Sequence, residues 1–234
     1  MNILHISDTH GFHGTFPNER FEGVDMVIHS GDCSNYRDPY RNANEVLDFI
    51  EWYKNIPVKY KIYVAGNHDT SIERRLVTPE YIKEQGIIYL ENESIQIEGI
   101  KIYGSPVTPT FGDWAFMKKR EKMHKFWTNI PEDTDILVVH GPPKGIRDIS
   151  LDRQNNLEMC GDLSLYKRIV ELQKNGLGAV LFGHIHNTEG VYNQGISTYS
   201  NLNKVIFSNG SCVDDGKFDR GLTSFGNIFV RSIY

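Results

Sequence analysis

Five short apolar runs recur along the chain, and each one ends in a polar or glycine-rich segment. The runs are NILHIS (2–7), VDMVIHS (24–30), KYKIYVA (59–65), DILVVH (135–140) and GAVLF (178–182), and the segments that follow them are DTHG, GDCSN, GNHD, GPPKG and GHIHN. Runs of this length that are rich in Val, Ile and Tyr are typical of strands buried on both faces. The pattern therefore predicts five strands, each followed at once by a turn.

Two segments between these runs have apolar residues at helical spacing. The first, NEVLDFIEWYKN at 44–55, has one apolar face and follows a start signal at Asp38–Pro39. The second, at 162–176, begins at a candidate N-cap, Asp162, and has a stop signal at Gly176. Alternating strands and helices predict an α/β fold with parallel pairing in at least part of the sheet.

The second half of the chain adds strand patterns without helices between them. Residues 94–105, SIQIEGIKIYGS, predict a hairpin that turns at Glu98–Gly99. Residues 191–230 predict a meander of further strands. We therefore expect a second sheet that is more antiparallel than the first.

The domain organisation follows from the evenness of this pattern. No linker-like, repetitive or low-complexity segment interrupts the sequence, which predicts a single domain over residues 1–234. Two long turn-rich segments, 104–116 and 141–161, are expected to be functional loops, because compact domains rarely carry such lengths without a use.

Composition limits the partners and the location. The 234 residues include 39% hydrophobic residues and carry a net charge of −5, which argues against a general nucleic-acid or membrane-surface binder. A small anionic substrate stays possible if a bound metal supplies local positive charge. Three widely spaced cysteines indicate a reducing compartment, and the sequence contains neither a signal-peptide pattern nor an apolar run long enough to span a membrane. We expect a cytoplasmic protein.

Metal-ligand chemistry follows each of the five predicted strands. Eight residues have suitable side chains: Asp8, His10, Asp32, Asn67, His68, His140, His184 and His186. A single aspartate or histidine at a strand end is more often a turn or cap residue. Five such strand ends in one chain favour a ligand site instead, because ligands of open α/β sheets bind beyond the carboxyl ends of the strands.

The donor types narrow the choice of metal. Imidazole, carboxylate and amide donors without a thiolate suit Mn, Fe, Zn or a similar divalent ion. Eight donors exceed the needs of one ion with open positions, so we expect two ions about 3.5–4 Å apart, with a carboxylate between them. Such a pair of ions stabilises both the attacking and the leaving oxygen of a phosphoryl transfer, and a bridging hydroxide would be the nucleophile.

The motifs DTH, GD, GNHD, the histidine of VVHG, and GHIH, in that order, resemble the signature of calcineurin-like metallophosphoesterases. The resemblance implies an α/β fold, a four-layer αββα sandwich of two mixed sheets flanked by helices. It also implies a ligand set: Asp8, His10 and His186 for one ion, Asn67, His140 and His184 for the other, and Asp32 as the bridge. His68 would protonate the leaving-group oxygen, and Asp69 would orient His68.

A narrower resemblance comes from three other segments. SPVTPTFGDWAF (105–116), HGPPKGIRD (140–148) and CGDLSL (160–165) are similar to the fetal-brain metallophosphoesterase-domain subgroup. That resemblance implies activity toward cyclic nucleotides. Within these segments, Phe111 and Trp114 either pack their loop down or stack on a nucleobase at the rim of the site.

Two motifs of this sequence differ from those of another branch of the family, and the difference indicates the type of phosphoester. Protein Ser/Thr phosphatases of this superfamily carry GDxxDR and RGNHE, whose arginines clamp a phosphomonoester dianion; here the sequence reads GDCSNY and AGNHD. Ala65 stands where the second arginine would be. The missing clamp favours phosphodiesters, which carry a single negative charge, although Arg37, Lys144 or Arg147 could replace it from a loop.

The sequence thus predicts a dinuclear metal-dependent phosphodiesterase that hydrolyses nucleotide-type phosphodiesters by attack of a metal-bridging hydroxide. Mn²⁺ is the favoured metal for assays. A phosphomonoesterase, either a nucleotidase or a protein Ser/Thr phosphatase, is the alternative. A nuclease and a non-catalytic scaffold are less favoured, since the chain lacks a basic groove pattern and no ligand is missing. The expected partner is a small phosphodiester or nucleotide, without nucleic acid or membrane.

Overall fold

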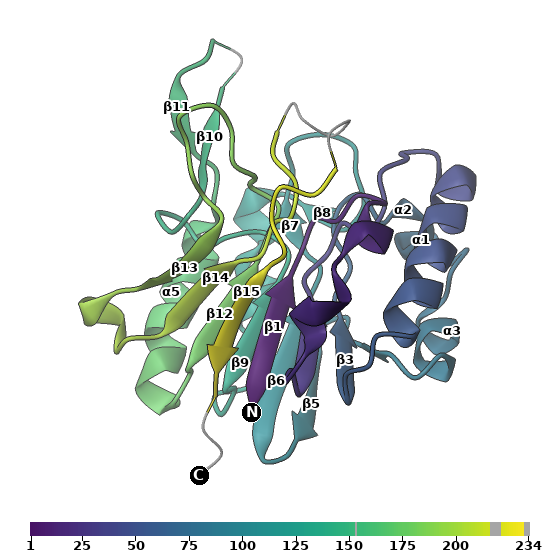
Figure 1. Ribbon diagram of the computed structural model, residues 1–234. Helices are drawn as coiled ribbons and strands as arrows, with labels where there is room; N and C mark the ends of the chain where they lie inside the picture. The colour runs from purple at the N-terminus through teal and green to yellow at the C-terminus, as the bar shows by residue number, and fades with distance from the viewer. Residues whose placement is uncertain (153, 216–220, 232–234) are drawn as a thin grey trace.

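Two mixed sheets lie face to face in the computed structural model, which describes residues 1–152, 154–215 and 221–231 (Figure 1). The first sheet has the strand order β15-β1-β2-β3-β4. Its strands are β1 (Asn2–Ile6), β2 (Met26–His29), β3 (Tyr60–Tyr63), β4 (Ile88–Tyr89) and β15 (Asn227–Val230). The second sheet has the order β13-β14-β12-β9-β6-β5. Its strands are β5 (Glu93–Ile97), β6 (Ile100–Ser105), β9 (Ile136–Val139), β12 (Ala179–Phe182), β13 (Gly195–Thr198) and β14 (Ile206–Asn209).

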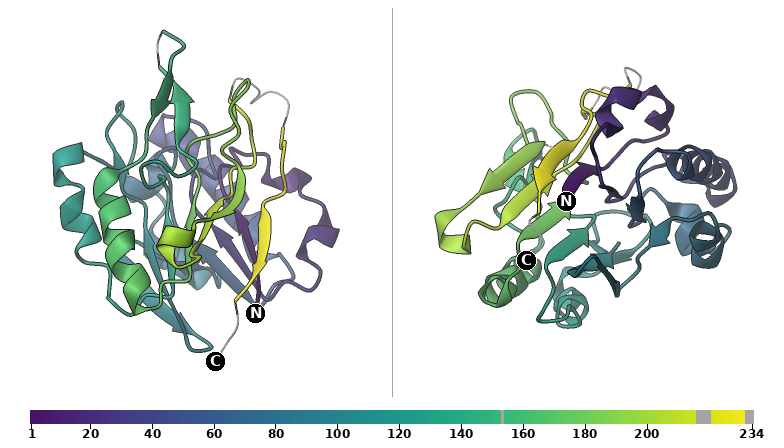
Figure 2. Two further views of the ribbon diagram at one scale, coloured as in Figure 1. Left: turned by 90° about the vertical axis from the view of Figure 1, so that its left-hand side faces the viewer. Right: turned by 60° about the horizontal axis from the view of Figure 1, so that its bottom comes forward.

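Helices cover the outer face of each sheet (Figure 2). The first sheet carries α1 (Pro39–Lys54), α2 (Thr70–Glu73) and α3 (Pro79–Glu84), and the second carries α4 (His124–Trp127) and α5 (Leu163–Leu172). The four layers are therefore α, β, β and α, as the sequence predicts. No helix formed by the described residues has the length and apolarity needed to span a bilayer.

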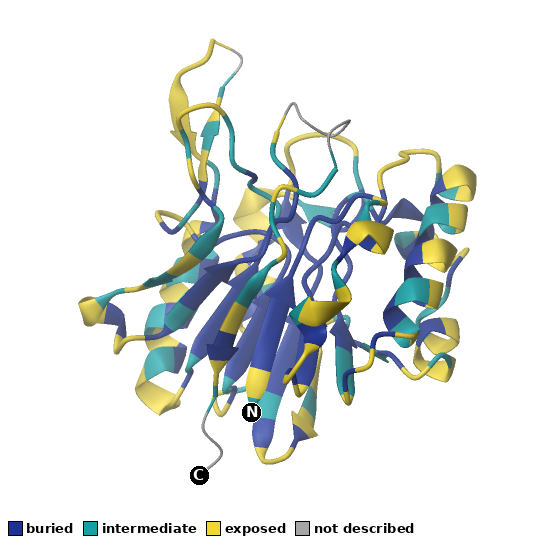
Figure 3. Ribbon diagram, in the orientation of Figure 1, coloured by how far each residue is buried: buried dark blue, intermediate teal, exposed yellow. Residues whose placement is uncertain are grey.

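Three apolar clusters hold these layers together, and the alternation of side chains along each strand builds them. In β9, Ile136 and Val138 point into the cluster between the two sheets, whereas Leu137 and Val139 point into the cluster under α4 and α5. Alternate residues of a strand face opposite sides of its sheet, so a strand between two apolar layers needs a continuous apolar run. The burial colours of Figure 3 show the result, with the central strands buried along their length.

The predicted helix starts are confirmed. Asp38 precedes α1, and its side chain accepts a hydrogen bond from the Arg41 backbone N–H. Asp162 caps α5 by accepting from the Leu165 N–H. The α5 helix continues into a short 3₁₀ turn that ends at Gly176, whose φ of 105° lies in the left-handed region.

The predicted meander over 191–230 is wrong. Strands β13 and β14 pair antiparallel in the second sheet, but β15 pairs with β1 in the first sheet. The second sheet is more antiparallel than the first, as predicted, because β13 and β5 at its edges run antiparallel to their neighbours. At its centre, β6, β9, β12 and β14 run in one direction. Local alternation predicts that these segments are strands, but the partner of each strand depends on distant residues.

The two predicted loops contain short strands of their own. Segment 104–116 includes β7 (Thr108–Pro109), which pairs with β8 (Met117–Lys118). Segment 141–161 includes a hairpin of β10 (Ile149–Leu151) and β11 (Leu157–Met159) that projects from the body of the molecule at the upper left of Figure 1.

Candidate metal centre

The carboxyl ends of five parallel strands meet at the upper edge of the two sheets in Figure 1. These are β1, β2, β3, β9 and β12, and each is followed by one or two ligand-type residues: Asp8 and His10, Asp32, Asn67 and His68, His140, and His184 and His186. The structure brings six of these residues into two groups, and both groups contribute side chains to the lining of one cavity.

The first group contains Asp8, His10 and His186, whose candidate ligand atoms all lie within 4.8 Å of one another. His186 Nε2 lies 3.1 Å from Asp8 Oδ1. His10 donates from Nδ1 to the Ser34 carbonyl at 3.1 Å, which leaves Nε2 as the ligand atom of its ring. The Ser211 hydroxyl donates to Asp8 Oδ2 at 2.9 Å and fixes the carboxylate.

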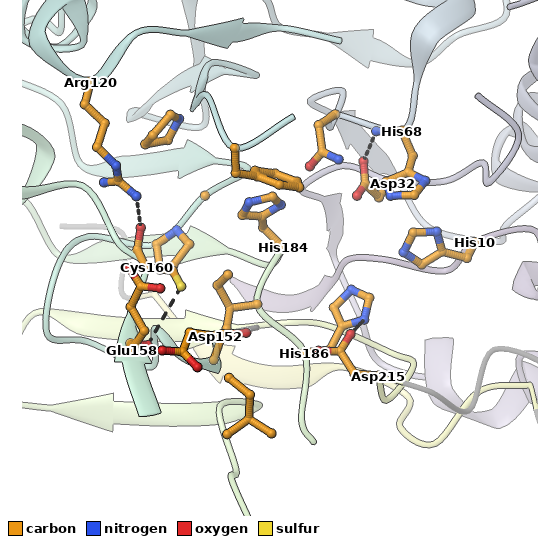
Figure 4. A pocket seen from close by; sticks show the side chains of 18 of the residues that line it. His10, Asp32, His68, Arg120, Asp152, Glu158, Cys160, His184, His186 and Asp215 are labelled. Atoms are coloured by element: carbon orange, nitrogen blue, oxygen red, sulfur yellow. Dashed lines mark hydrogen bonds and ion pairs between the residues drawn. The ribbon is translucent and has the colours of Figure 1, made fainter. Parts of the chain in front are cut away.

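The second group contains Asp32, His140 and His184, again with candidate ligand atoms within 4.8 Å. His140 Nε2 lies 3.1 Å from Asp32 Oδ2 and 3.0 Å from Asn67 Oδ1, so the amide oxygen joins this group. His140 Nδ1 donates to the Ser30 carbonyl at 2.8 Å. Figure 4 shows Asp32 between His184 on one side and His10 on the other.

Strained backbone brings these side chains together. Positive φ angles occur at four of them: 52° at Asp8, 43° at His10, 57° at Asp32 and 69° at His184. Residues other than glycine rarely adopt such angles, and the surrounding structure must stabilise them.

Two positions in the motifs require glycine because a carboxylate of the site lies too close to leave room for a Cβ. A Cβ on Gly66 would lie 2.2 Å from Asp32 Oδ1, and a Cβ on Gly183 would lie 2.0 Å from Asp8 Oδ2. Any larger residue in either position would displace a carboxylate from the site.

The buried carboxylates are ionised. Burial opposes the charge of Asp8, but His186, His140 and His10 outweigh it and hold its pKa well below the usual range. Burial likewise opposes the charge of Asp32, and the neighbouring histidines lower its pKa.

The pKa values of the histidines in the two groups are raised or lowered according to the charges around each ring. Burial disfavours the protonated form of His186, yet Asp8 and Asp215 outweigh burial and raise its pKa to about 10. In His140, Asp32 outweighs burial and raises the pKa to about 9. Burial lowers the pKa of His10 and of His184 to about 3. Ionised carboxylates beside imidazoles, without a thiolate, are a donor set that fits divalent ions such as Mn, Fe or Zn.

His68 lies beside the groups and lines the cavity. Its backbone N–H donates to Asp32 Oδ1 at 2.6 Å, and its Nδ1 lies 3.3 Å from the Asn35 carbonyl oxygen. The ring stacks on Trp114 with 4.0 Å between ring centroids.

The cavity above the two groups has a volume of about 720 Å³. His10, Asp32, Asn67, His68, His184 and His186 line it, and its walls include Phe111, Arg120 and part of the β10–β11 hairpin (Figure 4). The Phe111 side chain is 61% exposed, and its ring centroid lies 5.3 Å from that of His184.

A sequence comparison adds to this geometry. The model of the family described as "Calcineurin-like phosphoesterase" matches residues 1–188. The chain belongs to this family. The match includes every motif that the sequence analysis assigned to the metal groups.

The chain is also similar to individual human and nematode proteins. Human metallophosphoesterase domain-containing protein 1 is 32% identical over 219 residues, which covers 84% of this chain and 64% of the relative. The chain thus spans about two thirds of that protein's length. A UPF0046 protein of Caenorhabditis elegans is 31% identical over 217 residues, covering 86% of this chain and 74% of the relative.

More distant similarities agree with the fold. The DNA double-strand break repair protein Mre11 of Saccharolobus solfataricus is 26% identical over 207 residues, covering 80% of this chain and 49% of the relative. A solved crystal structure covers 89% of this chain and 89% of its own with a TM-score of 0.64 and 13% identity. At that identity, the similarity shows the fold alone.

Three of the residues predicted to bind substrate lie outside this cavity. Arg147 donates to the Ser197 hydroxyl and to three backbone carbonyls beside or in β13, those of Asn193, Gln194 and Ile196. Lys144 donates to the Met159 carbonyl and lines a different, outer hollow. Trp114 lines another hollow beside α1. Of the four predicted residues, Phe111 lines the site cavity.

The Asp69 carboxylate, which was predicted to orient His68, accepts its hydrogen bonds from other groups. Its Oδ2 accepts hydrogen bonds from the backbone N–H groups of Asp32 and Gly66 and from the Tyr63 hydroxyl. Its Oδ1 accepts from the Ser34 hydroxyl at 2.7 Å. The carboxylate therefore joins the loops that carry Asp32 and Asn67. The His68 ring is contacted by the Asn35 carbonyl, the Trp114 ring and the His10 ring.

Two charged residues of the cavity were not predicted from the sequence. Asp215 Oδ1 lies 3.1 Å from His186 Nδ1, on the ring nitrogen opposite Asp8. Arg120 lines the wall and donates to the carbonyls of Cys160 and Gly161. Neither residue follows one of the five apolar runs that carry the motifs, so no local pattern distinguishes it from other charged loop residues.

Proposed function

We propose that this phosphoesterase is a dinuclear metal-dependent phosphodiesterase that acts on small nucleotide-type phosphodiesters. The charge of the cavity carries the proposal. Among its described lining residues, Arg120 is the one Lys or Arg, and its guanidinium already donates to two backbone carbonyls. Asp152, Glu158 and Asp215 add negative charge to the walls. Such a cavity suits a diester, which carries one negative charge, better than a dianionic monoester.

Seven residues would hold the two ions. Asp8, His10 and His186 would bind one ion, Asn67, His140 and His184 the other, and Asp32 both. When bound, the ions supply Lewis acidity toward the phosphoryl oxygens and toward the attacking water. The protein keeps the donors in place through the Ser30 and Ser34 carbonyls, which fix the ring orientation of His140 and His10.

His68 would donate a proton to the leaving-group oxygen. Its ring borders the cavity and is half-buried, so a substrate can reach it. The Asn35 carbonyl accepts only, so it takes the hydrogen on Nδ1 and leaves Nε2 for the proton that moves. General acids of this kind contribute about 10²–10⁴-fold to the rate.

The size of the cavity supports a nucleotide-type substrate. Its volume of about 720 Å³ lies within the range of about 300–1,000 Å³ that is usual for small-molecule sites. The exposed ring of Phe111 at its wall can stack on a base. The three cysteines are free, which is consistent with a reducing compartment, and we include a cytoplasmic location in the proposal.

Paired substrates test the proposal. The Mn²⁺-loaded protein should hydrolyse bis-p-nitrophenyl phosphate faster than p-nitrophenyl phosphate under the same conditions. Faster monoester hydrolysis would instead support a phosphomonoesterase. A second screen of 3′,5′- and 2′,3′-cyclic nucleotides, dinucleotides, mononucleotides and single-stranded DNA then identifies the substrate class. Activity restricted to DNA would favour a nuclease, the activity suggested by the name of the Mre11 relative.

A further inference from the structure

Trp114 lies in the loop between β7 and β8, and that loop is fixed on the segment that carries His68. The Ala115 backbone N–H donates to the Asn67 carbonyl at 3.0 Å. The next N–H, that of Phe116, donates to the Glu73 side chain at 2.8 Å. Ala115 and Phe116 are both buried. Two hydrogen bonds directly after Trp114 therefore set its position relative to the turn that follows β3.

The Trp114 ring stacks on the His68 ring. The two centroids are 4.0 Å apart and the planes differ by 27°. The Arg37 guanidinium also lies over the Trp114 ring, 5.2 Å from its centroid, and donates to the Asp113 carbonyl beside it. Trp114 is thus held by its backbone neighbours and by a cation in addition to His68.

The contacts of His68 leave few orientations open to its ring. The Asn35 carbonyl lies 3.3 Å from Nδ1, and the His10 ring meets the His68 ring edge-on with 4.8 Å between centroids. Trp114 covers a face of the imidazole. Trp114 itself lines a separate hollow of about 410 Å³ with Arg37 and Tyr40, so it stands behind His68 as seen from the site cavity.

We propose that Trp114 is a positioning residue, which holds the His68 imidazole in the orientation needed to protonate the leaving group, and is not a platform for the substrate's base. This inference rests on the proposed function, because it assumes that His68 is the general acid. A misplacement of about 1 Å in a reacting group can cost about 10²-fold in rate, so the loss of this stack should be measurable.

Two diesters that differ in their leaving group test the proposal. We would assay methyl p-nitrophenyl phosphate and methyl phenyl phosphate with Mn²⁺. The p-nitrophenolate ion leaves readily without protonation, whereas the phenolate depends more on a general acid. The Trp114→Ala variant should lose about 10- to 100-fold in kcat with the phenyl ester, a smaller factor with the nitrophenyl ester, and leave KM unchanged. Trp114→Phe should recover part of the loss.

A double-mutant cycle with His68→Ala shows whether Trp114 acts through His68. In the His68→Ala background, Trp114→Ala should cause no further loss with the phenyl ester. Losses that multiply, equal losses with both esters, or a change confined to KM would overturn the proposal. Tyr40→Ala is the control, since Tyr40 lines the same hollow from α1 and should leave both esters unaffected.

A measurement without substrate separates this inference from the proposed function. In the NMR spectrum of the metal-free protein, the His68 ring protons, assigned by their absence in His68→Ala, should be shifted upfield by the Trp114 ring. Trp114→Ala should remove that shift. If the wild-type protein hydrolyses neither diester, the proposed function fails, and the NMR result alone decides the contact. Unshifted His68 protons in the wild type would overturn the positioning role.

Discussion

The carboxylate of Asp69 is completely buried and accepts hydrogen bonds from the backbone of Asp32 and Gly66 and from the hydroxyls of Ser34 and Tyr63. Burial and the nearby Asp32 charge raise its pKa. The hydrogen bonds join two turns, one after β2 and one after β3, and each turn carries a proposed metal ligand. One side chain therefore sets the distance between Asp32 and Asn67.

Replacing Asp69 with Ala should lower both stability and metal affinity. The substitution leaves several buried donors without an acceptor, and each such donor costs about 1–3 kcal/mol. We expect the free energy of unfolding in urea to fall by about 3 kcal/mol or more, together with weaker Mn²⁺ binding in calorimetry.

Tyr63→Phe is the matched control for this change. It removes a single donor to Asp69 and should cost about 1 kcal/mol. A stable Asp69→Ala protein whose loss is confined to turnover of poor leaving groups would restore the role in orienting His68 that the sequence predicted.

At the scale of elements, Arg147 fixes the segment between β9 and α5 to the edge of the second sheet. Its guanidinium reaches three backbone carbonyls and one hydroxyl of residues 193–197. The β10–β11 hairpin begins two residues later, so this contact fixes the base of the hairpin that walls the cavity.

The Arg147→Met variant should therefore lose stability without a specific loss of substrate binding. It keeps the apolar stem but removes a half-buried set of hydrogen bonds, and we expect the free energy of unfolding to fall by about 2–3 kcal/mol. Lys144→Ala, an exposed neighbour with one hydrogen bond to a carbonyl, should change stability by less than about 0.5 kcal/mol. A raised KM in an Arg147→Met protein of normal stability would contradict this structural role.

In this chain the sequence predicts the strands, the helices and the clustering of ligand-type residues better than it predicts which strands pair. The clustering of Asp8, Asp32 and His140 could be predicted because each lies within three residues of the end of its strand, and parallel strands bring such positions to one edge. The positions of Trp114 and Arg147 could not, because each depends on the path of a long loop. The pairing of β15 could not be predicted either, because its residues are typical of a strand but its partner, β1, lies more than 200 residues away.

At the scale of the whole molecule, the proposed metal ligation would make metal and protons compete for the same histidines. In the metal-free protein, His186 and His140 have pKa values raised from 6.5 to about 10 and about 9. Their pairing with Asp8 and Asp32 is fully present below about pH 6.5 and is lost as the pH rises through those values. Metal binding requires the deprotonated rings, so it strengthens over the same range.

As the pH rises from 7 to 9, the melting temperature of the metal-free protein should therefore decrease. Over the same range, the increase in melting temperature that Mn²⁺ causes should become larger. Scanning calorimetry with Mn²⁺ or with a chelator, under nitrogen, measures both. At 100 times its dissociation constant an ion contributes about 2.7 kcal/mol. In the His186→Gln variant, the rise in melting temperature caused by Mn²⁺ should grow less with pH than in the wild type. An increase that is the same at every pH would contradict the competition.

The single domain predicted over 1–234 is a separate expectation for the whole molecule. An apolar cluster between the sheets contains residues of both, among them Ile3, Ile62, Val138 and Leu181. Shared burial of this kind couples the sheets, so we expect one cooperative unfolding transition whose calorimetric enthalpy equals its van't Hoff enthalpy. Two separable transitions in the metal-free protein would contradict a single domain.

The pairing of β1 with β15 has a consequence during synthesis. The strand that carries Asp8 to the site leaves the ribosome well before its antiparallel neighbour, which lies more than 200 residues later in the sequence. Domains that depend on contacts so distant in sequence fold slowly, because a long loop must close first. Until residues 227–230 emerge, the first sheet of the nascent chain has β1 as an unpaired edge that could recruit another chain.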